Sequence, residues 1–555
     1  MPYCLMILKE NIINRKYKNM AKKEKTKIES LDDILFNCRN LLRGRASMAD
    51  KRDMLLTLVF LRFTNDRFEK RREEIKKELK QRGINEASPF FDTMLERPQS
   101  YGENIYLQDD CRWSKIEKTE TSKYPITLDD IIYKIESRNP QRLKGALPQQ
   151  IFTSSGIPAN TIKDVVDEVA KIREVSFPEY KDLIGRVYEY FLQAFAVNSE
   201  KEEGEFYTPH SIVELLAELI EPYDGTIYDP CCGSGGMFVQ AANVVESHGG
   251  KKKNITVYGQ EIQPETYRLA KMNMAVRGIE CKLGDMPAST FTHDQHPGKK
   301  MDYIMANPPF NLKKWRGSKE LLTDYRWKID NEGDYLVPPE SNANYAWILH
   351  ILSKLNPKTG IAGFLLSNGA LGDMDTLNIR RELIKKDKVE AIIVLPRQMF
   401  YSTDISVTIW ILNQNKKGGE WHNRNLRNRT GEILFMDLRT WNDQIDMKKY
   451  VKFEPERIKE IADIYHNWQM EGTDGLNYAK PELYRSVSID EISSEENNWS
   501  LIPSRYIEFV DQDQFLDYES IMKDSADVIK GLLDEQNQND CDLRKAFEVL
   551  GYKMN

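Results

Sequence analysis

The stretch Asn307-Pro308-Pro309-Phe310 closes an apolar run, Tyr303-Ile304-Met305-Ala306, and has the character of a strand end. Its two prolines give a stiff backbone, and Pro308 biases Asn307 towards an extended conformation. The Asn307 side-chain carbonyl and the Pro308 main-chain carbonyl could accept both hydrogens of a planar amine while Phe310 stacks on the attached ring. On these residues alone, a Pro-Pro turn with Phe310 in the core remains the alternative.

Three acidic or glycine-rich strand ends precede this segment. Each follows a short apolar strand, so the pattern of alternating strands and helices predicts a doubly wound α/β domain. A glycine loop between a strand and a helix lets a ligand approach backbone N–H groups, and a carboxylate after the second strand can hold ribose hydroxyls. A third acid is placed to touch an adenine amino group. The three are Asp229 with the loop Gly233-Ser234-Gly235-Gly236, then Glu261, then Asp285.

The glycine spacing helps to choose the cofactor. It does not match a dinucleotide fingerprint, and no Gly-Lys-Ser/Thr marks a triphosphate loop. Asp229 before the loop suits the ammonium and sulfonium of S-adenosylmethionine better than a pyrophosphate. A tight packing turn would explain the glycines alone, but their occurrence in series with Glu261, Asp285 and Asn307 favours a cofactor site.

Composition sets the general class of the protein. The chain has 555 residues, of which 40% are hydrophobic and 30% charged, as in a soluble globular protein. The sequence contains no long apolar run of the kind that would predict a membrane span. The seven cysteines show no metal-site spacing and indicate reduced thiols in a cytoplasm. With a formal net charge of −7, a DNA-binding role requires a local positive surface or a partner.

Periodicity and linkers divide the chain into four parts. Residues 1–29 form a Lys/Arg-rich leader that we expect to be disordered, and residues 30–197 form a helical domain with a buried helix around Met54–Leu61. Residues 198–445 form the α/β domain, in which 407–412 and 433–436 are expected to make a closing hairpin. Residues 446–555 are expected to be helical and to dock partners, on two apolar stripes. The stripes are Ile458, Ile461, Tyr465, Trp468, and Phe515, Ile521, Met522, Val528, Ile529, Leu532, Leu533.

Two basic segments are candidate DNA contacts. In each, a solvated charged loop is the alternative. One segment follows the Pro-Pro stretch and includes an aromatic residue; the other connects the two strands of the expected hairpin. Their members are Lys313, Lys314, Trp315, Arg316, and Lys416, Lys417, Arg424, Arg427, Arg429.

The order of motifs resembles that of the modification subunits of type I restriction-modification systems, which are N6-adenine DNA methyltransferases. The matching segments are Leu183–Tyr190, Gly204-Glu205-Phe206-Tyr207-Thr208-Pro209, Asp229–Gly236, Asn307–Phe310 and Leu395–Phe400. The resemblance implies a Rossmann-like methyltransferase domain, with Asn307, Pro308, Pro309 and Phe310 catalytic and no metal. It also implies S-adenosylmethionine binding by Glu205, Phe206, Tyr207, Thr208, Pro209, Asp229, Gly233, Ser234, Gly235, Gly236, Glu261 and Asp285.

The resemblance further implies how the subunit works. We expect it to methylate N6 of an adenine flipped out of double-stranded DNA, at a site chosen by a separate specificity subunit. Other expected partners are a second copy of the chain and a restriction subunit. Two alternatives remain: a methyltransferase for a protein glutamine or an RNA base, and a non-catalytic scaffold that binds DNA or cofactor.

Overall fold

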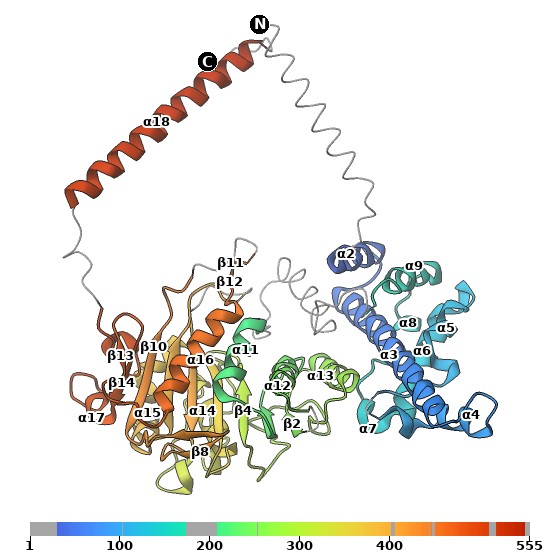
Figure 1. Ribbon diagram of the computed structural model, residues 1–555, viewed down its shortest axis with the longest axis horizontal. Helices are drawn as coiled ribbons and strands as arrows, with labels where there is room; N and C mark the ends of the chain where they lie inside the picture. Colours follow the sequence, from blue (N-terminus) through green and yellow to red (C-terminus); the bar gives the residue numbers. More distant parts are fainter. Residues whose placement is uncertain are drawn as a thin grey trace.

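The computed structural model describes residues 30–102, 104–173, 208–251, 254–400, 406–442, 445–446, 450–509 and 518–549. It contains an N-terminal helical domain, an α/β domain and a long C-terminal helix (Figure 1). Among the described residues, no helix combines the length and the apolar character that crossing a membrane requires. The expected leader, residues 1–29, lies outside the described residues.

The helical domain is built around one long helix. The apolar run 54–61 is buried on nearly every side of this helix, which confirms the bundle predicted from its periodicity. The hydroxyl of Ser47 begins the helix by accepting from Asp50 N at 3.1 Å. The helices are α2 (Leu31–Leu41), α3 (Met48–Gln81), α4 (Pro89–Leu95), α5 (Trp113–Glu117), α6 (Tyr124–Arg138), α7 (Pro140–Leu143), α8 (Ile151–Ser154) and α9 (Ala159–Val169).

The α/β domain is organised on a ten-stranded sheet in the order β13-β14-β10-β6-β7-β5-β4-β1-β2-β3. Strands β3, β2, β1, β4 and β5 run parallel, β7 is antiparallel to both β5 and β6, and β10 is parallel to β6. The strands are β1 (Gly225–Asp229), β2 (Ile255–Gly259), β3 (Cys281–Lys282), β4 (Tyr303–Ala306), β5 (Ile361–Ser367), β6 (Val389–Val394), β7 (Val407–Asn413), β10 (Glu432–Asp437), β13 (Ala479–Lys480) and β14 (Tyr484–Ser488).

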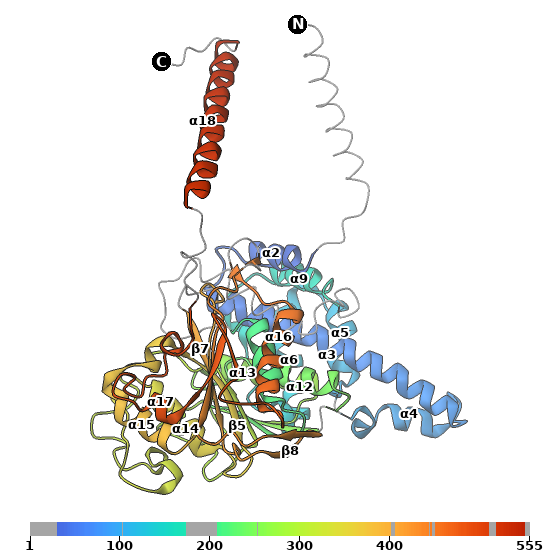
Figure 2. The ribbon, with the colours of Figure 1, turned by 60° about the vertical axis from the view of Figure 1, so that its left-hand side comes forward.

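Helices cover both faces of this sheet, as expected for a doubly wound fold. Figure 2 shows α14, α15 and α17 on one side of the sheet and α12 and α16 on the other. The helices are α11 (His210–Ile220), α12 (Gly236–Ser247), α13 (Pro264–Arg277), α14 (Asn344–Lys354), α15 (Leu377–Lys385), α16 (Pro455–Gln469) and α17 (Ile489–Ile492). The short pairs β8 (Gly419–Trp421) with β9 (Arg424–Leu426), and β11 (Ile445–Asp446) with β12 (Tyr450–Val451), lie outside the main sheet.

Two expectations about this domain are wrong. Strands β7 and β10 do not form a hairpin, because β6 lies between them in the sheet. The domain also does not end at residue 445: β13 and β14 extend its sheet, and the apolar stripe of α16 is buried in its core. Residues 446–509 therefore belong to the α/β domain. The apolar stripe of α16 is buried against the sheet, so this stripe cannot also contact a partner.

Helix α13 connects the two domains. Tyr267 and Met274 pack into the core beside the sheet, whereas Leu269, Met272 and Val276 pack into the core of the helical domain. At the same junction, Arg67 Nη1 donates to the Val276 carbonyl at 2.7 Å, and Lys271 Nζ donates to the Lys144 carbonyl at 3.1 Å. The helical domain is thus attached to the part of the sheet that ends in β1, β2 and β3.

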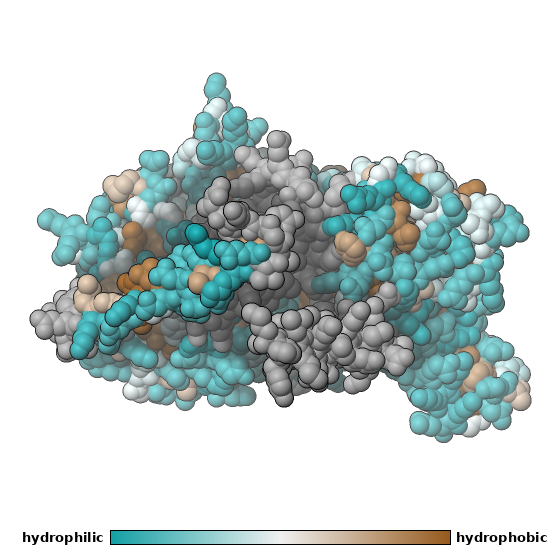
Figure 3. Space-filling model, turned by 90° about the horizontal axis from the view of Figure 1, so that it is seen from above, coloured by the Kyte–Doolittle hydropathy of each residue, from teal (hydrophilic) through white to brown (hydrophobic). Residues whose placement is uncertain are grey.

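The C-terminal helix α18 (Tyr518–Val549) differs from the others in its exposure. From residue 522 to residue 548 its side chains are exposed, and Figures 1 and 2 draw it apart from both domains. Apolar residues appear brown among its teal residues in Figure 3. The exposed large apolar residues of α18 are Met522, Val528, Ile529, Leu532, Leu533, Leu543 and Phe547.

Candidate functional site

The candidate site lies at the carboxyl ends of β1, β2, β3 and β4. Asp229 is the last residue of β1, and Glu261, Asp285 and Asn307 come shortly after β2, β3 and β4. Because these strands are parallel neighbours, their ends meet at one edge of the sheet. The fold therefore brings together the strand-end groups that were singled out in the sequence.

The glycine loop shapes the first part of the site. Gly235, with φ of 81°, caps α12 in the left-handed region, where a side chain is disfavoured. A Cβ there would also lie 3.0 Å from the Met274 Cε atom of α13. The turn is closed by a 2.8 Å hydrogen bond from Gly235 N to the Cys232 carbonyl. The loop thus presents the N-terminus of α12 at the sheet edge, a setting that favours a polar ligand.

Glu261 joins this loop to the end of β2. Its Oε2 accepts from Gly233 N at 2.9 Å, and its Oε1 accepts from Ile262 N and Gln263 N at 2.9 and 2.8 Å. The side chain is buried. The carboxylate is therefore fixed by main-chain donors on both sides, and it holds the glycine loop against the second strand as well as being a candidate ligand for hydroxyls.

Asp229 is a buried acid of the site whose pKa is raised. The residue is only 2% exposed, and its Oδ1 accepts from Cys231 N at 3.0 Å. Burial raises the pKa of this carboxyl to about 7, and the charge of Glu261 adds to the effect, whereas the hydrogen bonds from Cys231 oppose it. An acid with such a pKa changes charge near neutrality, so its attraction for a cation depends on pH.

Asp285 lies at the rim of the site. Its side chain is exposed, while its main-chain N–H donates to Gln295 Oε1 at 2.7 Å. The neighbouring Gly284 carbonyl accepts from the Tyr267 hydroxyl at 2.8 Å. The bend after β3 is therefore held from both sides, and its carboxylate remains at the surface of the site.

The Asn307 side chain is held by one hydrogen bond and has one oxygen without a partner among the described residues. Its Nδ2 donates to Thr208 Oγ1 at 2.8 Å, so the amide group is oriented by a residue 99 positions away in the chain. Its Oδ1 is buried and has no hydrogen-bond partner within the described part of the protein. A buried acceptor without a partner is costly, so this oxygen is a candidate acceptor for a ligand.

Thr208 and Pro209 are thus at the site, the former touching Asn307 and the latter capping α11. Glu205, Phe206 and Tyr207, the other expected cofactor residues of that segment, lie outside the described residues, as does Leu183–Tyr190.

Phe400 is a site residue that sequence reasoning did not assign a role. Its ring meets that of Phe310 edge to face, with centroids 6.2 Å apart and planes at 84°. Phe310 is half-buried and Phe400 is buried. In the sequence, Phe400 is the last residue of the segment Leu395–Phe400, which supports the family resemblance. That segment does not indicate that Phe400 contacts the catalytic stretch.

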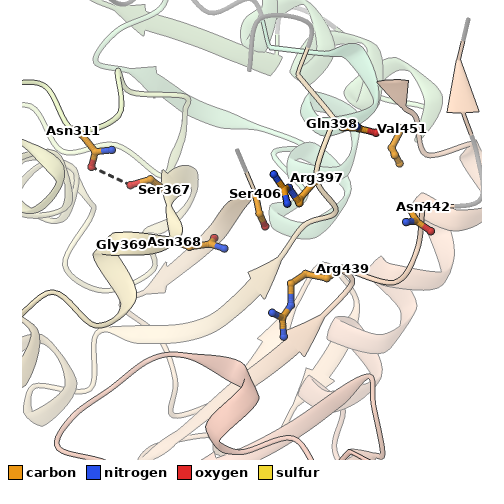
Figure 4. Close-up of a pocket in the computed structure, with 10 residues that line it drawn as sticks. All are labelled: Asn311, Ser367, Asn368, Gly369, Arg397, Gln398, Ser406, Arg439, Asn442 and Val451. Carbon is orange, nitrogen blue, oxygen red and sulfur yellow. Dashed lines mark hydrogen bonds between the residues drawn. The ribbon is translucent and has the colours of Figure 1, made fainter. Parts of the chain in front are cut away.

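A cavity of about 860 Å³ opens beside Asn311, immediately after the catalytic stretch (Figure 4). It continues the site along the carboxyl ends of β5, β6 and β10. Asn311 Oδ1 accepts from Ser367 Oγ at 3.1 Å and from Asn344 Nδ2 at 2.9 Å, which fixes the wall between the two regions. The lining residues are Asn311, Ser367, Asn368, Gly369, Arg397, Gln398, Ser406, Arg439, Asn442 and Val451.

Neither basic segment is as free as the sequence suggested. Trp315 is buried and its ring packs 4.6 Å from that of Phe291, so it cannot stack on a DNA base, although Lys313 and Lys314 are exposed. In the second segment, four of the five basic residues make internal ion pairs. These pairs are Lys416 with Asp387, Arg424 with Glu221, Arg427 with Glu432, and Arg429 with Glu390. These pairs contradict the alternative of a simple mobile charged loop, whereas a DNA contact by this segment, in which Lys417 is exposed, stays a prediction.

The fold and the row of strand-end groups define an α/β enzyme of the S-adenosylmethionine-dependent methyltransferase class. Family models match twice along the chain: "N-6 DNA Methylase" over residues 179–515 and "HsdM N-terminal domain" over residues 31–169. The first match spans more than half of the chain and includes the whole of the described site.

Curated relatives agree with these matches. The HindI methylase subunit of a type I restriction enzyme from Haemophilus influenzae is 36% identical, over 77% of this chain and 92% of its own. The MjaIX methylase subunit from Methanocaldococcus jannaschii is 31% identical, over 94% and 91%. A solved type I methyltransferase subunit from Streptococcus thermophilus shares the fold with a TM-score of 0.66, at 21% identity, over 87% of this chain and all of that one.

The chain therefore belongs to the N-6 DNA methylase family, among the methylase subunits of type I restriction-modification systems. It is an adenine-specific DNA methyltransferase, and S-adenosylmethionine is its methyl donor.

Proposed function

We propose that Asn307, Pro308 and Phe310 hold a flipped adenine while the amine at N6 takes the methyl group of S-adenosylmethionine. The observation that carries this proposal is the buried, unpartnered Oδ1 of Asn307. An adenine N6 lone pair is delocalised into the ring and is a poor nucleophile. Acceptors at Asn307 Oδ1 and the Pro308 carbonyl would hold both N–H groups and concentrate electron density on the nitrogen. The N6 lone pair would form the new N–C bond while the S–CH3 bond breaks with its electron pair left on sulfur, and one N6 proton would pass to solvent.

The aromatic pair beside Asn307 supplies the surface for the base. An adenine inside a duplex cannot reach a side chain at a sheet edge, so it must leave the stack. Phe310 offers a half-buried ring face, and the perpendicular Phe400 supports it from the side. We infer that the base stacks on Phe310 with its amine directed to Asn307.

The residues that we propose bind the cofactor lie at the same edge of the sheet. S-adenosylmethionine supplies the methyl group and has two positive centres and a ribose. Asp229 offers a buried carboxylate to the positive end, Glu261 offers oxygens to the ribose hydroxyls, and Asp285 offers an acceptor at the rim. The glycine loop and Thr208 complete the site that we propose, together with Glu205, Phe206, Tyr207 and Pro209.

The proposed function is tested by methyl transfer with labelled S-adenosylmethionine and duplex DNA, using the full chain with and without co-purified partners. We expect label on DNA, recovered as N6-methyladenine, and only with the partner-containing sample at a defined site. Label recovered only on protein or RNA, the alternative acceptors with a planar amine, would contradict the proposal.

We expect cofactor affinity to fall as the pH is lowered through neutrality. The carboxyl of Asp229, with a pKa of about 7, is ionised above that pH and neutral below it, and only the ionised form attracts a cation. Affinity for S-adenosylmethionine should therefore decrease by up to about tenfold per pH unit below pH 7. Calorimetric titration between pH 6 and pH 8.5 measures this.

The matched variant for this titration is Asp229→Asn. It should bind weakly and show little dependence on pH over the same range, because its side chain no longer changes charge. A wild-type affinity that stays constant across neutrality would rule out Asp229 as the partner of the positive end.

We propose that α18 docks a partner subunit, and that this partner is the specificity subunit that the resemblance to type I modification subunits implies. Met522, Ile529 and Leu543 recur at multiples of seven residues, and Leu532 follows Ile529 by three. Such spacing is that of a helix that packs in a coiled coil or a helix bundle. A second copy of the chain, a restriction subunit and a cytoplasmic location complete the proposed setting.

Ile529→Asp should abolish co-purification of this partner, because it places a charge in the centre of the apolar seam. The change should leave cofactor binding intact, since α18 is exposed and remote in sequence from the site. Lys530→Asp is the control, as it introduces the same side chain one position away from the seam. Pull-down of tagged partner measures both; equal recovery would contradict the docking role.

A further inference from the structure

Asn311, the residue after Phe310, carries an amide whose orientation is set by its neighbours. The main-chain N–H of Asn311 donates to Asn344 Oδ1 at 2.9 Å. Because that oxygen accepts from a main-chain donor, the other arm of the Asn344 amide is the NH2 group, and it donates to Asn311 Oδ1 at 2.9 Å. The Asn344 side chain is buried, so this pair of hydrogen bonds is a fixed part of the fold.

A second asparagine repeats this arrangement. Asn342 Oδ1 accepts from the main-chain N–H of Asn344 at 2.9 Å, so Asn342 Nδ2 is the donor to Asn311 Oδ1 at 3.3 Å. Ser367 Oγ donates to the same Asn311 oxygen at 3.1 Å. Asn311 Oδ1 therefore accepts from three donors, and its identity as the oxygen of the amide is set by two main-chain N–H groups.

The Nδ2 atom of Asn311 is thus a donor with a fixed direction. It makes no hydrogen bond to the part of the chain that the structure describes, and the residue is exposed beside the catalytic stretch. Figure 4 shows the oxygen of this amide bonded to Ser367 and the nitrogen on the other arm. The backbone of Asn311 has φ of 54°, a left-handed conformation that asparagine adopts more readily than most residues. The residue next to the ring proposed to stack on the base therefore presents a free, oriented N–H group.

An adenine has hydrogen-bond acceptors on both sides of its amine. N6 carries two hydrogens, and the ring nitrogens N1 and N7 lie on either side of it and accept hydrogen bonds. In the proposed function, Asn307 Oδ1 and the Pro308 carbonyl accept the two amine hydrogens, which leaves the ring nitrogens without a donor. Asn311 Nδ2 supplies a donor close in sequence to these two acceptors. The catalytic stretch and Asn311 together then match the donor and acceptor pattern of one edge of adenine.

We propose that Asn311 is a further base-binding residue, whose Nδ2 donates to the ring nitrogen beside the target amine, N1 or N7. This inference rests on the proposed function, because it takes the base to be held at Asn307 and Phe310. A third hydrogen bond fixes the rotation of the base about the axis through its amine, which two contacts to the same nitrogen leave free. A donor at N7 would in addition reject cytosine, which has a C–H group at the matching position.

The test separates this donor from the structural role of the same side chain. The full chain with its co-purified partners is assayed on duplex DNA that carries the methylated site identified in the host genome. Asn311→Gly keeps the left-handed turn and removes the amide, and its kcat/KM should fall about tenfold. Asn311→Asp keeps an oxygen for the three donors but places a second oxygen where the N–H group was, so its kcat/KM should fall further. If Asn311 only held the turn, Asn311→Asp would be as active as wild type.

Base analogues locate the contact. The same duplex is made with 1-deazaadenine or 7-deazaadenine at the target, each of which keeps the amine and replaces one ring nitrogen by C–H. One of the two should lower kcat/KM of wild type about tenfold more than that of Asn311→Gly, because the variant has no donor to lose. Comparing the two proteins cancels the effect of the analogue on the amine itself. Asn331→Gly, the same change at another exposed asparagine with φ of 59°, is the control and should match wild type on every duplex.

The inference is overturned if Asn311→Asp methylates DNA as fast as wild type, or if both analogues affect Asn311→Gly as much as wild type. Affinity for S-adenosylmethionine should be unchanged in both Asn311 variants, and a fall in that affinity as large as the fall in kcat/KM would also overturn it. Failure of the proposed function gives a different pattern, because Asn307→Ala would then remain active. An inactive Asn307→Ala protein without coupling between Asn311 and either analogue would remove Asn311 alone.

Discussion

Asn307→Ala is expected to lower kcat for DNA methylation by roughly 100- to 1,000-fold or more, in line with removal of a preorganised polar group at a reacting centre. The truncation removes the buried Oδ1 that we propose accepts from N6. Affinity for S-adenosylmethionine should be largely preserved, because its three proposed carboxylate ligands lie on other strand ends. Single-turnover methylation with saturating cofactor measures the first quantity, and calorimetric titration measures the second.

Two variants of Thr208 sharpen this prediction. Thr208→Val removes the Oγ1 that accepts from Asn307 Nδ2 and leaves a side chain of the same shape. Its kcat should fall by about tenfold, as expected when a positioning hydrogen bond is lost. Thr208→Ser keeps the hydroxyl and should retain most of the activity. Near-normal turnover by Asn307→Ala would show that another group holds the amine, and near-normal turnover by Thr208→Val would show that the orientation of Asn307 does not matter.

Glu261→Ala is expected to weaken S-adenosylmethionine binding by roughly 100-fold or more. The carboxylate accepts from three main-chain N–H groups, and hydrogen bonds to a charged acceptor each contribute about 1.5–3 kcal/mol. Its loss therefore removes a proposed ribose ligand and also releases the glycine loop from the end of β2. Glu261→Gln should be intermediate, because an amide presents an N–H group to one of these donors.

Two measurements separate these effects from general damage. Thermal unfolding of Glu261→Ala without cofactor reports the loss of the loop contacts, and calorimetric titration reports cofactor affinity. Glu280→Ala, which changes an exposed acid just before β3, is the control and should match wild type in both. A folded Glu261→Ala protein that binds the cofactor normally would remove Glu261 from the proposed site.

The sheet and the row of strand-end groups could be predicted from sequence because each is marked locally. Strand β4 begins and ends at Tyr303 and Ala306, as its apolar run and the following prolines indicate, and β2 ends at Gly259, shortly before the predicted acid. Parallel strands place their carboxyl ends together whatever the details of packing. Local sequence pattern and fold class were therefore enough to predict that Asp229, Glu261 and Asn307 lie close together.

The features that sequence did not predict depend on contacts between distant residues. The burial of Arg429 against Glu390, with both side chains fully buried, is invisible in a segment that looks like a charged loop. The insertion of β7 between β5 and β6 is likewise a matter of topology, since an antiparallel strand has the same apolar run as a parallel one. The perpendicular contact of Phe400 with Phe310 is another contact between distant residues that the sequence does not predict.

Helix α13 sets a practical limit on how this protein can be divided. Since its residues Leu269, Met272 and Val276 complete the core of the helical domain, a fragment that begins after residue 208 would expose this apolar surface to water. Such a fragment should aggregate unless those positions are made polar. Chimaeras between relatives would need to exchange α13 together with the N-terminal helices. Because α13 also packs beside the sheet, the helical domain and this part of the α/β domain would have to come from the same relative.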